Sequence, residues 1–279
     1  RICSVSGCFY VVPADGAASE LGFGQEKNLG YRYLSFNPHR SIGIPRVKYV
    51  KPENMYLYAK EIQMAKRLLF PESWQVNTLI YAFKKKIFPS PATYHLGYDK
   101  IEMTRAIKAR FPLNIPKTKF YSNLTVHFDH LVDEFGLPFV CKEIRNSSGL
   151  GVHLINKEED FLMFKQNNSI IYVQEYIQID RDLRVVVIGD TAVDFYWRVK
   201  GPGNFHSNLA RGAEIYRNDI PMDVIDDVLR IALLLEVNYA GFDIALTETG
   251  LKIFEFNLYF GTKGIRFNSI EMGNAINQY

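Results

Sequence analysis

Two strand-like segments near the C-terminal end of the sequence constrain the fold most. They run from Tyr239 to about Thr247 and from Leu251 to Asn257, and the turn residues Glu248-Thr249-Gly250 lie between them. A three-residue loop with its glycine in the left-handed conformation would pair Thr247 with Leu251. The sequence therefore predicts an antiparallel hairpin with a defined register.

This register places Asp243 directly opposite Glu255, and Asn257 lies two residues farther along the same face. Two facing carboxylates repel each other, most strongly where water is excluded, so a cation should compensate them. Carboxylate and amide oxygens are ligands that suit Mg²⁺. A polar hairpin face neutralised by Lys or Arg is the alternative, because ion-pair networks also gather charged groups.

The rest of the sequence alternates helical and strand patterns. Helices are expected at 53–67, 99–111, 124–135 and 158–165, and from Pro221 onward. Strands are expected at 68–70, 118–121, 139–144, 151–155, 170–175, 183–188 and 192–199. These patterns predict an α+β fold with antiparallel sheets built from hairpins. The helix followed by a strand at 53–70 favours a small α/β domain ahead of them.

Composition excludes several classes of function. The 279 residues include 33 Lys and Arg against 30 Asp and Glu, and these charges are interspersed, so we expect no nucleic-acid partner. The longest apolar runs fall far short of the roughly 20 residues that span a membrane, so we expect no membrane partner. The cysteines are Cys3, Cys8 and Cys141, too few for a disulfide framework or a zinc site. A reducing cytoplasm fits best.

A glycine-containing turn at 146–151 is a candidate phosphate site. Its sequence is Asn-Ser-Ser-Gly-Leu-Gly, and its backbone N–H groups could cradle a phosphate, although it lacks the Gly-Lys-Ser/Thr ending of a P-loop. Lys142 lies on the preceding strand, on a face shared with apolar residues, where a lysine needs an anionic partner or a route to water. We expect Lys142, Ser148, Gly149 and Gly151 to contact phosphate, and a plain hairpin turn is the alternative.

A basic set surrounds the middle hairpin and is interleaved with Asp182. Its members are Arg184, Arg198, His206, Asn208 and Arg211. Arginine suits bidentate capture of carboxylate or phosphate, and a converging set would hold a charged transition state. A sheet surface with paired ions is the alternative.

Residues 99–265 resemble the ATP-grasp domain of the RimK-like glutamate ligases in motif order and spacing. The resembling stretches are Asp99 to Thr104, Val140 to Glu143 with its glycine turn, Val173 to Ile177, Asp182 to Asp190, Phe205 to Gly212, and Gly241 to Asp243 with Phe254 to Asn257. Each motif alone is weak, but six in order identify the family.

The resemblance implies an ATP-grasp fold at 98–279, in which a lid-bearing subdomain (98–177) and a metal-binding subdomain (178–279) enclose ATP behind an N-terminal α/β domain (1–97). It implies that ATP and Mg²⁺, with Mn²⁺ as a substitute, are required. The residues expected to bind ATP are Lys100, Lys142, Ser148, Gly149, Gly151, Gln174, Glu175, Tyr176, Ile177, Asp182, Arg184 and His206. Of these, residues 174–177 would form the adenine hinge, and Asp182 would lie near the ribose.

The resemblance also assigns the metal to Asp243, Glu255 and Asn257, the positions reached from the hairpin register. Arg198 and Arg211, with Asn208 nearby, would stabilise an acyl phosphate and the tetrahedral species that follows. The activity implied is an ADP-forming carboxylate–amine ligase.

The substrates are left open by departures from the family pattern. Bulky Tyr259 and Phe260 follow Asn257, where the family usually carries small residues, and His206 replaces a frequent arginine. The acceptor carboxylate and the amine, such as glutamate, could each belong to a small molecule, a peptide or a protein tail, and an oligomer is left open. An ATP-grasp kinase and a non-catalytic nucleotide-binding regulator are the alternatives.

Overall fold

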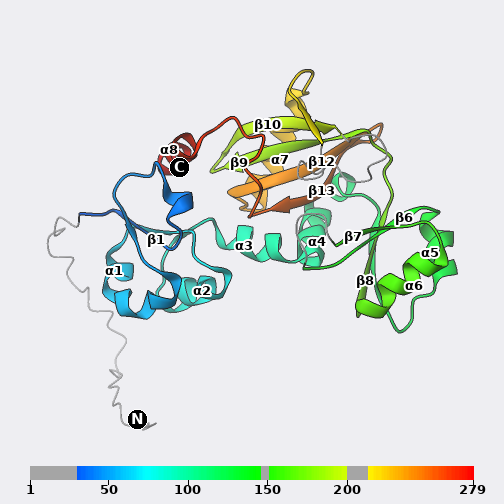
Figure 1. Ribbon diagram of the computed structural model, residues 1–279, viewed down its shortest axis with the longest axis horizontal. Helices are drawn as coiled ribbons and strands as arrows, with labels where there is room; N and C mark the ends of the chain where they lie inside the picture. The colour runs from blue at the N-terminus through cyan, green and yellow to red at the C-terminus, as the bar shows by residue number, and fades with distance from the viewer. Residues whose placement is uncertain (1–29, 146–150, 200–212) are drawn as a thin grey trace, which may run out of the picture. The chain divides into compact units, whose positions relative to one another are not determined.

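The computed structural model describes residues 30–145, 151–199 and 213–279. The first sheet of the described chain includes β1 (Figure 1), has the order β2-β1-β3-β4, and its strands pair in parallel. Its strands are β1 (Tyr33–Ser35), β2 (Val47–Tyr49), β3 (Arg67–Leu69) and β4 (Ile87–Phe88). Parallel strands need crossover connections, and helical segments supply them here. The α/β character predicted for this part is confirmed.

Short helices connect these strands. They are η1 (His39–Ser41), η2 (Pro52–Tyr58), α1 (Ala59–Met64), α2 (Ser73–Asn77) and the π-helical turn η3 (Thr78–Ala82). The helix predicted at 53–67 is present as η2 followed by α1, but its predicted end was too late. Ala65 adopts an extended backbone, and this lets the chain enter β3.

Two helices and a single turn follow: α3 (Pro91–Tyr98), α4 (Lys100–Arg110) and η4 (Pro112–Asn114). Asp99 begins α4 as predicted, because its side chain accepts hydrogen bonds from the backbone N–H groups of Ile101 at 2.9 Å and Glu102 at 3.3 Å. Met103 and Ile107 on the buried face of α4 belong to the same apolar core as the C-terminal sheet.

The middle sheet has the order β5-β8-β6-β7, with antiparallel pairings. Its strands are β5 (Thr118–Ser122), β6 (Phe139–Lys142), β7 (Val152–Ile155) and β8 (Ile170–Glu175), and its helices are α5 (Phe128–Phe135) and α6 (Glu158–Asn167). Leu124, which was expected on the face of α5, is 84% exposed and precedes the helix. The helix does end at Gly136, which has a φ of +72°.

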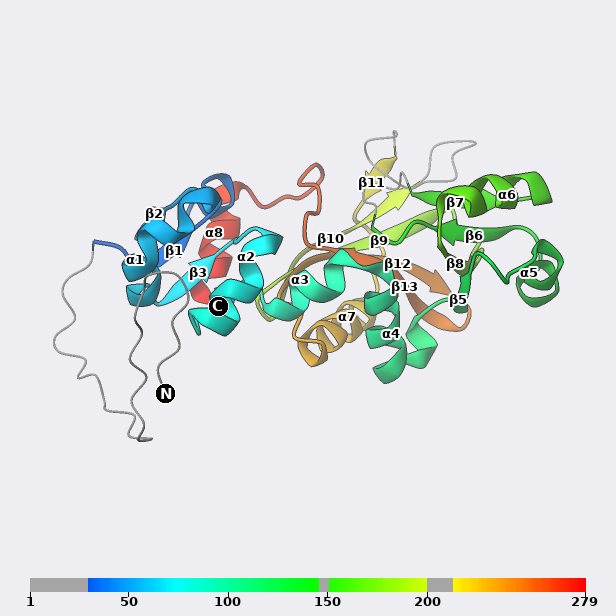
Figure 2. The ribbon, with the colours of Figure 1, turned by 90° about the horizontal axis from the view of Figure 1, so that it is seen from below.

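The C-terminal sheet has the order β11-β10-β9-β12-β13, and its pairings are antiparallel. Its strands are β9 (Arg181–Ile188), β10 (Thr191–Val199), β11 (Glu214–Tyr216), β12 (Tyr239–Thr247) and β13 (Gly250–Asn257), and the helix α7 spans Met222–Leu234. Figure 2 shows α7 below this sheet, and contacts of α7 with β9 and β10 agree with that placement.

The two faces of the C-terminal sheet differ in chemistry because side chains alternate along each strand. Leu183, Val185 and Val187 of β9 share a core with α7. On the other face, Asp182 and Arg184 are buried polar side chains, whereas Val186 and Ile188 join the apolar core of the N-terminal strands. One end of this second face is therefore apolar, and the other end carries charge.

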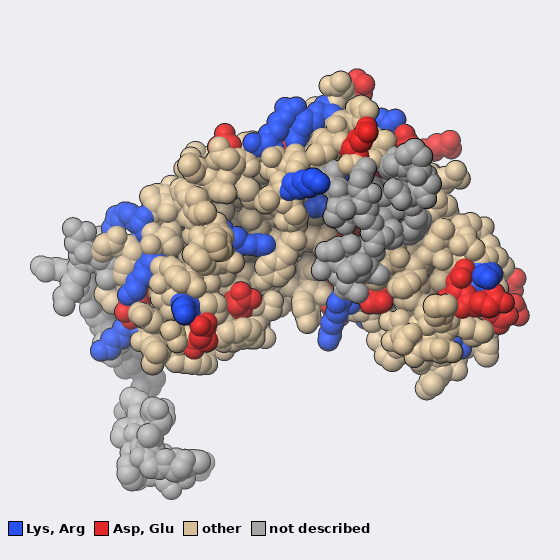
Figure 3. Space-filling model, viewed as in Figure 1, with Lys and Arg blue, Asp and Glu red and all other residues tan. Residues whose placement is uncertain are grey.

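The last helix, α8 (Ser269–Gln278), packs against η1. Gly273 allows this close approach, because a Cβ atom there would lie 2.3 Å from the carbonyl oxygen of Ile42. Within the described residues, no helix has both the length and the apolar character that a membrane span requires. On the face drawn in Figure 3, described Lys and Arg side chains lie in separate groups among uncharged surface and acidic residues.

Candidate active site

The terminal hairpin has the predicted pairing at the site but a different loop. Thr247 pairs with Gly250, so the loop contains only Glu248 and Thr249, and the predicted three-residue loop was wrong. An irregularity at Phe254 then adds one residue to β13, and the ladder continues with Asp243 opposite Glu255. The bulge compensates for the shorter loop, so the two carboxylate-bearing residues face each other as expected.

Asp243 lies between two arginines. Its Oδ1 is 2.7 Å from Arg184 Nε and 3.0 Å from Arg198 Nη2, and its Oδ2 accepts a hydrogen bond from Arg184 Nη2 at 3.3 Å. All three side chains are buried. The strand register explains the gathering, because Asp243 pairs with Arg184 across β12 and β9.

Arg198 also binds Asp182 on the neighbouring strand β9. Its Nε and Nη2 each donate to a different oxygen of Asp182 at 2.7 Å, which is the bidentate geometry of strong guanidinium–carboxylate pairs. Burial alone would lower the pKa of Arg198, but the charges of Asp243 and Asp182 raise it above its ordinary value. Asp182, Arg184, Arg198 and Asp243 thus form a buried network with equal numbers of positive and negative groups.

Glu255 and Asn257 lie on the adjacent strand. The side-chain Nδ2 of Asn257 donates to Glu255 Oε1 at 2.9 Å, and this bond does not use the amide oxygen of Asn257, which is an acceptor. Glu255 Oε2 lies 4.0 Å from Lys100 Nζ, at the start of α4. The sequence placed Lys100 and Glu255 in one site, and the structure brings these two side chains together.

Lys142 at the end of β6 is almost fully buried, with 5% of its surface exposed. Its Nζ donates to the carbonyl oxygen of Phe254 at 3.4 Å and lies 5.7 Å from the ring centres of Phe254 and Tyr172. Burial lowers the pKa of Lys142 to about 8, and the charge of Lys100 adds to this effect while Glu255 and Asp243 oppose it. An amine in these surroundings favours an anionic ligand.

The predicted adenine hinge continues from β8. The Gln174 side chain is buried and donates to Thr118 Oγ1 at 2.9 Å and to the Tyr172 hydroxyl at 3.3 Å, so it holds the sheet together. Glu175 accepts from the backbone N–H of Lys117 at 2.7 Å. Tyr176 and Ile177 are partly buried beyond the end of the strand. Their contact with adenine remains a prediction.

Several predicted residues lie outside the described part of the chain. They are Ser148, Gly149, His206, Asn208 and Arg211. Gly151 is described and buried, and its carbonyl oxygen accepts from the Glu143 backbone N–H at 2.7 Å. The phosphate cradle at the glycine turn therefore stays a prediction.

The donor set fits a hard divalent cation. Asp243 Oδ1 is buried without an aligned hydrogen bond, although two guanidinium nitrogens lie within 3.0 Å of it. Asn257 adds an amide oxygen, and Glu255 is held only loosely by Lys100. Mg²⁺ commonly uses one or two carboxylates together with substrate phosphates, so Asp243, Glu255 and Asn257 could hold it.

Two supporting features of the site were missed in the sequence. The buried hydroxyl of Tyr172 forms a 2.9 Å hydrogen bond with Thr104 Oγ1, which links α4 to the middle sheet beside Lys142. Burial raises the pKa of Tyr172 to about 12. Gly241 leaves space for Arg184, because a Cβ atom there would lie 2.5 Å from Arg184 Nη1. Gly241 and Asp243 are two residues apart and therefore lie on the same face of the strand, and this spacing could have indicated the space beside Asp243.

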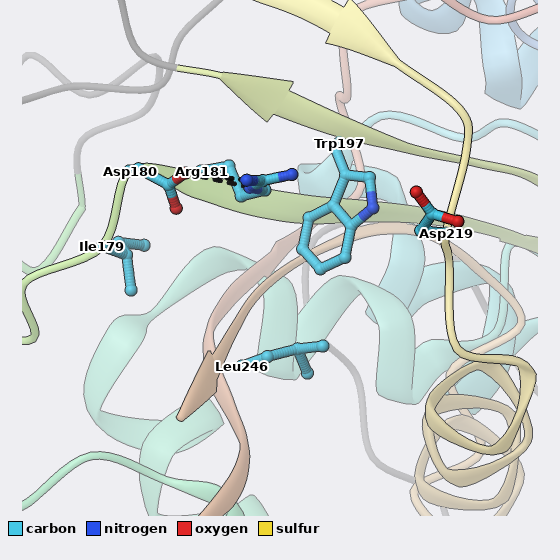
Figure 4. A pocket seen from close by; sticks show the side chains of 6 residues that line it. All are labelled: Ile179, Asp180, Arg181, Trp197, Asp219 and Leu246. Atoms are coloured by element: carbon cyan, nitrogen blue, oxygen red, sulfur yellow. Dashed lines mark hydrogen bonds and ion pairs between the residues drawn. The ribbon is translucent and has the colours of Figure 1, made fainter. Parts of the chain in front are cut away.

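A pocket of about 180 Å³ lies near the start of β9 (Figure 4). Its lining includes Trp197, whose ring centre is 5.7 Å from Arg181 Cζ. Arg181 and Trp197 alternate with Asp182 and Arg198 along their strands, so they belong to the opposite face of the sheet. We therefore do not assign this pocket to the charged network.

Comparisons with known sequences all indicate the same protein family. A model of the RimK-like ATP-grasp domain matches residues 98–279. A "Probable alpha-L-glutamate ligase" of Pseudomonas paraeruginosa is 34% identical over 139 residues, which cover 47% of this chain and 45% of that protein. "Probable alpha-L-glutamate ligase 2" of Shewanella denitrificans is 30% identical over 191 residues, which cover 65% and 62%. The matches thus span about half of the length of these relatives.

Solved structures share the fold at low sequence identity. A D-alanine–D-alanine ligase from Bacillus anthracis has a TM-score of 0.66 at 11% identity, with 89% of this chain and 96% of that one covered. An ATP-grasp RimK domain protein from Sphaerobacter thermophilus has a TM-score of 0.65 at 16% identity, with 89% and 98% covered. The expected ATP-grasp fold is confirmed.

Proposed function

Because the chain belongs to the RimK-like ATP-grasp family, we propose that it is an ATP- and Mg²⁺-dependent ligase that joins a carboxylate to an amine. The observation that carries this proposal is the gathering of two lysines and two arginines around the facing residues Asp243 and Glu255. Lys100 approaches Glu255, and Arg184 and Arg198 approach Asp243. The positive side chains would complement the negative charge of a nucleoside triphosphate, and the two carboxylates would complement the charge of its metal ion.

In the proposed reaction, an oxygen of the acceptor carboxylate attacks the γ-phosphorus of ATP, and the bond to the ADP oxygen breaks. The amine nitrogen then attacks the acyl carbon, loses a proton, and expels inorganic phosphate. The products are an amide, ADP and phosphate. No protein nucleophile is needed, so the protein acts by positioning the substrates and by stabilising developing charge.

The described residues have separate roles in this proposal. Lys100 and Lys142 would neutralise phosphate oxygens, and the buried position of Lys142 would strengthen its contact because water is excluded. Asp243, Glu255 and Asn257 would hold Mg²⁺, which would withdraw negative charge from the reacting phosphate when bound. Without metal, the guanidinium groups of Arg184 and Arg198 compensate the negative charge of Asp243. When substrates bind, their anionic groups would become new partners for these arginines.

Arg198 and Arg211 are proposed to stabilise the acyl phosphate and the tetrahedral species, assisted by Asn208; Arg211 and Asn208 lie outside the described residues. The glutamate ligases named above support glutamate as one amine to test, and the acceptor would be a small molecule, a peptide or a protein tail. The scarcity of cysteine leads us to propose a reducing, cytoplasmic setting.

The test is phosphate release from ATP and Mg²⁺ in a matrix of carboxylates and amines, including amino acids and short peptides. A ligase should release phosphate only when both substrates are present, with one amide formed per ADP. A stable phosphorylated product without any amine would instead show a kinase. Nucleotide binding without turnover across the whole matrix would favour a non-catalytic regulator.

A matched pair of variants connects the chemistry to the site. Arg198→Lys should lower kcat by about a hundredfold or more, because lysine cannot reproduce the bidentate geometry. Arg217→Lys is the control: Arg217 also binds a buried aspartate of β10, Asp194, at 2.6 Å and 3.2 Å, but outside the charged network. Equal losses of kcat per folded molecule in the two variants would contradict a role for Arg198 in the reaction.

A further inference from the structure

Arg40 of η1 is a half-buried guanidinium in an aromatic setting. Its Cζ lies 4.6 Å from the ring centre of Tyr259, 5.9 Å from that of Tyr239 and 6.0 Å from that of Phe70. Its Nη1 donates to the carbonyl oxygen of Leu258 at 3.4 Å. Stacking on rings leaves the N–H edge of a guanidinium available for a ligand in its plane.

Arg40 has no carboxylate within ion-pair distance among the residues that the structure describes. The carbonyl of Leu258 is the acceptor that its side chain contacts there. The nearby acid Glu72 lies at the N-terminal cap of α2, where its backbone carbonyl oxygen accepts from the backbone N–H of Gln75 at 2.9 Å. Among the described residues no carboxylate neutralises this partly buried guanidinium, so an anionic ligand would supply a counter-charge.

The positive charge of Arg40 affects the pKa of the surrounding tyrosine hydroxyl groups. Burial raises the pKa of Tyr94, Tyr239 and Tyr259, and in each case the Arg40 charge acts in the opposite direction. The negative charge of Glu72 raises the pKa of Tyr94 and Tyr259 further. The raised pKa values mean that burial and Glu72 disfavour negative charge in these surroundings, so the guanidinium of Arg40 is the group that would favour an anion there.

The position of Arg40 connects it with the charged network. Tyr239 lies on the same face of β12 as Gly241 and Asp243, and its ring centre is 5.1 Å from that of Phe260. Phe260 in turn covers Gly241, where a Cβ atom would lie 2.8 Å from Phe260 Cβ. Four residues of strand, roughly 14 Å, separate Tyr239 from Asp243. A substrate that contacts both ends would need a length of about three or four extended residues.

From this geometry we infer that Arg40 binds a carboxylate of the organic substrate, at a distance from the reacting group. The inference rests on the proposed function and adds a substrate class, namely a molecule with a second acidic group. Tyr259, the bulky residue that departs from the family pattern, lies over Arg40 and helps to form this site. The carboxylate could belong to the acceptor or to the amine donor, and binding experiments separate these two sources.

The test uses calorimetry with Mg²⁺ and the ATP analogue AMP-PNP present. The acceptor probe is N-acetyl-triglutamate, which has no free amine, and its control is N-acetyl-triglutamine amide. L-glutamate is the probe for the amine donor. Arg40→Gln should bind one of the acidic probes at least about tenfold more weakly than the wild type, since it loses a charge-assisted contact. Arg40→Lys should recover part of the affinity.

Arg32→Gln is the matched variant, because Arg32 is an exposed arginine of the same part of the chain and also lies over a tyrosine ring, at 5.2 Å. It should bind every probe like the wild type. Unfolding measurements on all variants give the folded fraction, so a purely structural Arg40 would lower stability while leaving affinity per folded molecule unchanged.

Equal affinities of the wild type and Arg40→Gln for both acidic probes would overturn the inference, as would the absence of acidic-probe binding to the wild type. Binding is independent of turnover, so the two proposals can fail separately. Arg40-dependent binding without amine-dependent phosphate release would reject the ligase alone. Ligase turnover that is unchanged in Arg40→Gln, with equal probe affinities, would reject the carboxylate site alone.

Discussion

Replacing Lys142 by methionine should stabilise the folded protein and weaken its binding of nucleotide. Burial lowers the pKa of Lys142 from 10.5 to about 8. At about 1.4 kcal/mol per pKa unit, this difference corresponds to a cost of about 3 kcal/mol for holding the charged amine in the folded state. Methionine has a similar length and no charge, so Lys142→Met should gain about 1 to 3 kcal/mol at pH 7 without ligands.

The same pKa gives the gain a defined pH dependence. Below pH 8 the amine is charged in both the folded and the unfolded chain, so the full cost is present. Between about pH 8 and 10.5 the unfolded chain binds the proton more strongly, and the wild type therefore becomes more stable as the pH rises. The stability difference between Lys142→Met and the wild type should shrink across this window.

Urea unfolding followed by circular dichroism, with EDTA at pH 7 and pH 9.5, measures these differences. Calorimetry with ATP and Mg²⁺ should show affinity weakened by about 1.5 to 3 kcal/mol, the scale of a charge-assisted contact. Lys157→Met is the control, because Lys157 is exposed and pairs only loosely with Glu159 at 3.8 Å. A less stable Lys142→Met with unchanged ATP affinity would refute the reasoning and make Lys142 a structural residue.

Two further changes probe the network around Asp243. Gly241→Ala should destabilise the fold by about 1 to 3 kcal/mol, because its Cβ would collide with a guanidinium nitrogen and a phenyl ring, whereas Gly261→Ala has open space and should be neutral in thermal unfolding. Asp182→Asn should lower the free energy of unfolding, measured with denaturant, by about 3 kcal/mol, because Arg198 loses its bidentate carboxylate partner. An unchanged free energy of unfolding would show that Asp243 alone is a sufficient partner for Arg198.

The sequence predicted the facing carboxylates through two errors that cancelled. Turn rules gave a three-residue loop, whereas the structure has a two-residue loop and an extra residue at Phe254. A bulge depends on packing of the strand against its surroundings, which local turn chemistry does not contain. Asp243 opposite Glu255 was therefore predicted correctly, although the loop and the pairing of Thr247 were not.

Long-range pairing was harder to predict than local structure. The cap at Asp99 and the strand at Ile170–Glu175 follow from local patterns, and both are present. The ion pairs of Asp182 and Asp243 with Arg198 depend on the order of strands in the sheet, which a single sequence does not specify. The sequence assigned Arg198 to the reacting species and kept a sheet surface with paired ions as the alternative. In the structure Arg198 pairs with two buried carboxylates, and its contact with the reacting species stays a prediction.

Glu255→Gln tests the proposed metal site most directly, because it changes one oxygen to nitrogen with almost no change in shape. Turnover is measured as ADP formation with Mg²⁺, and unfolding is measured without metal. The account predicts loss of turnover with a fold about as stable as the wild type, because the glutamine oxygen can still accept from Asn257 Nδ2 and Glu255 is held only loosely by Lys100 at 4.0 Å. Full activity per folded molecule, with markedly lower stability, would contradict the metal site and make Glu255 a structural ion-pair partner.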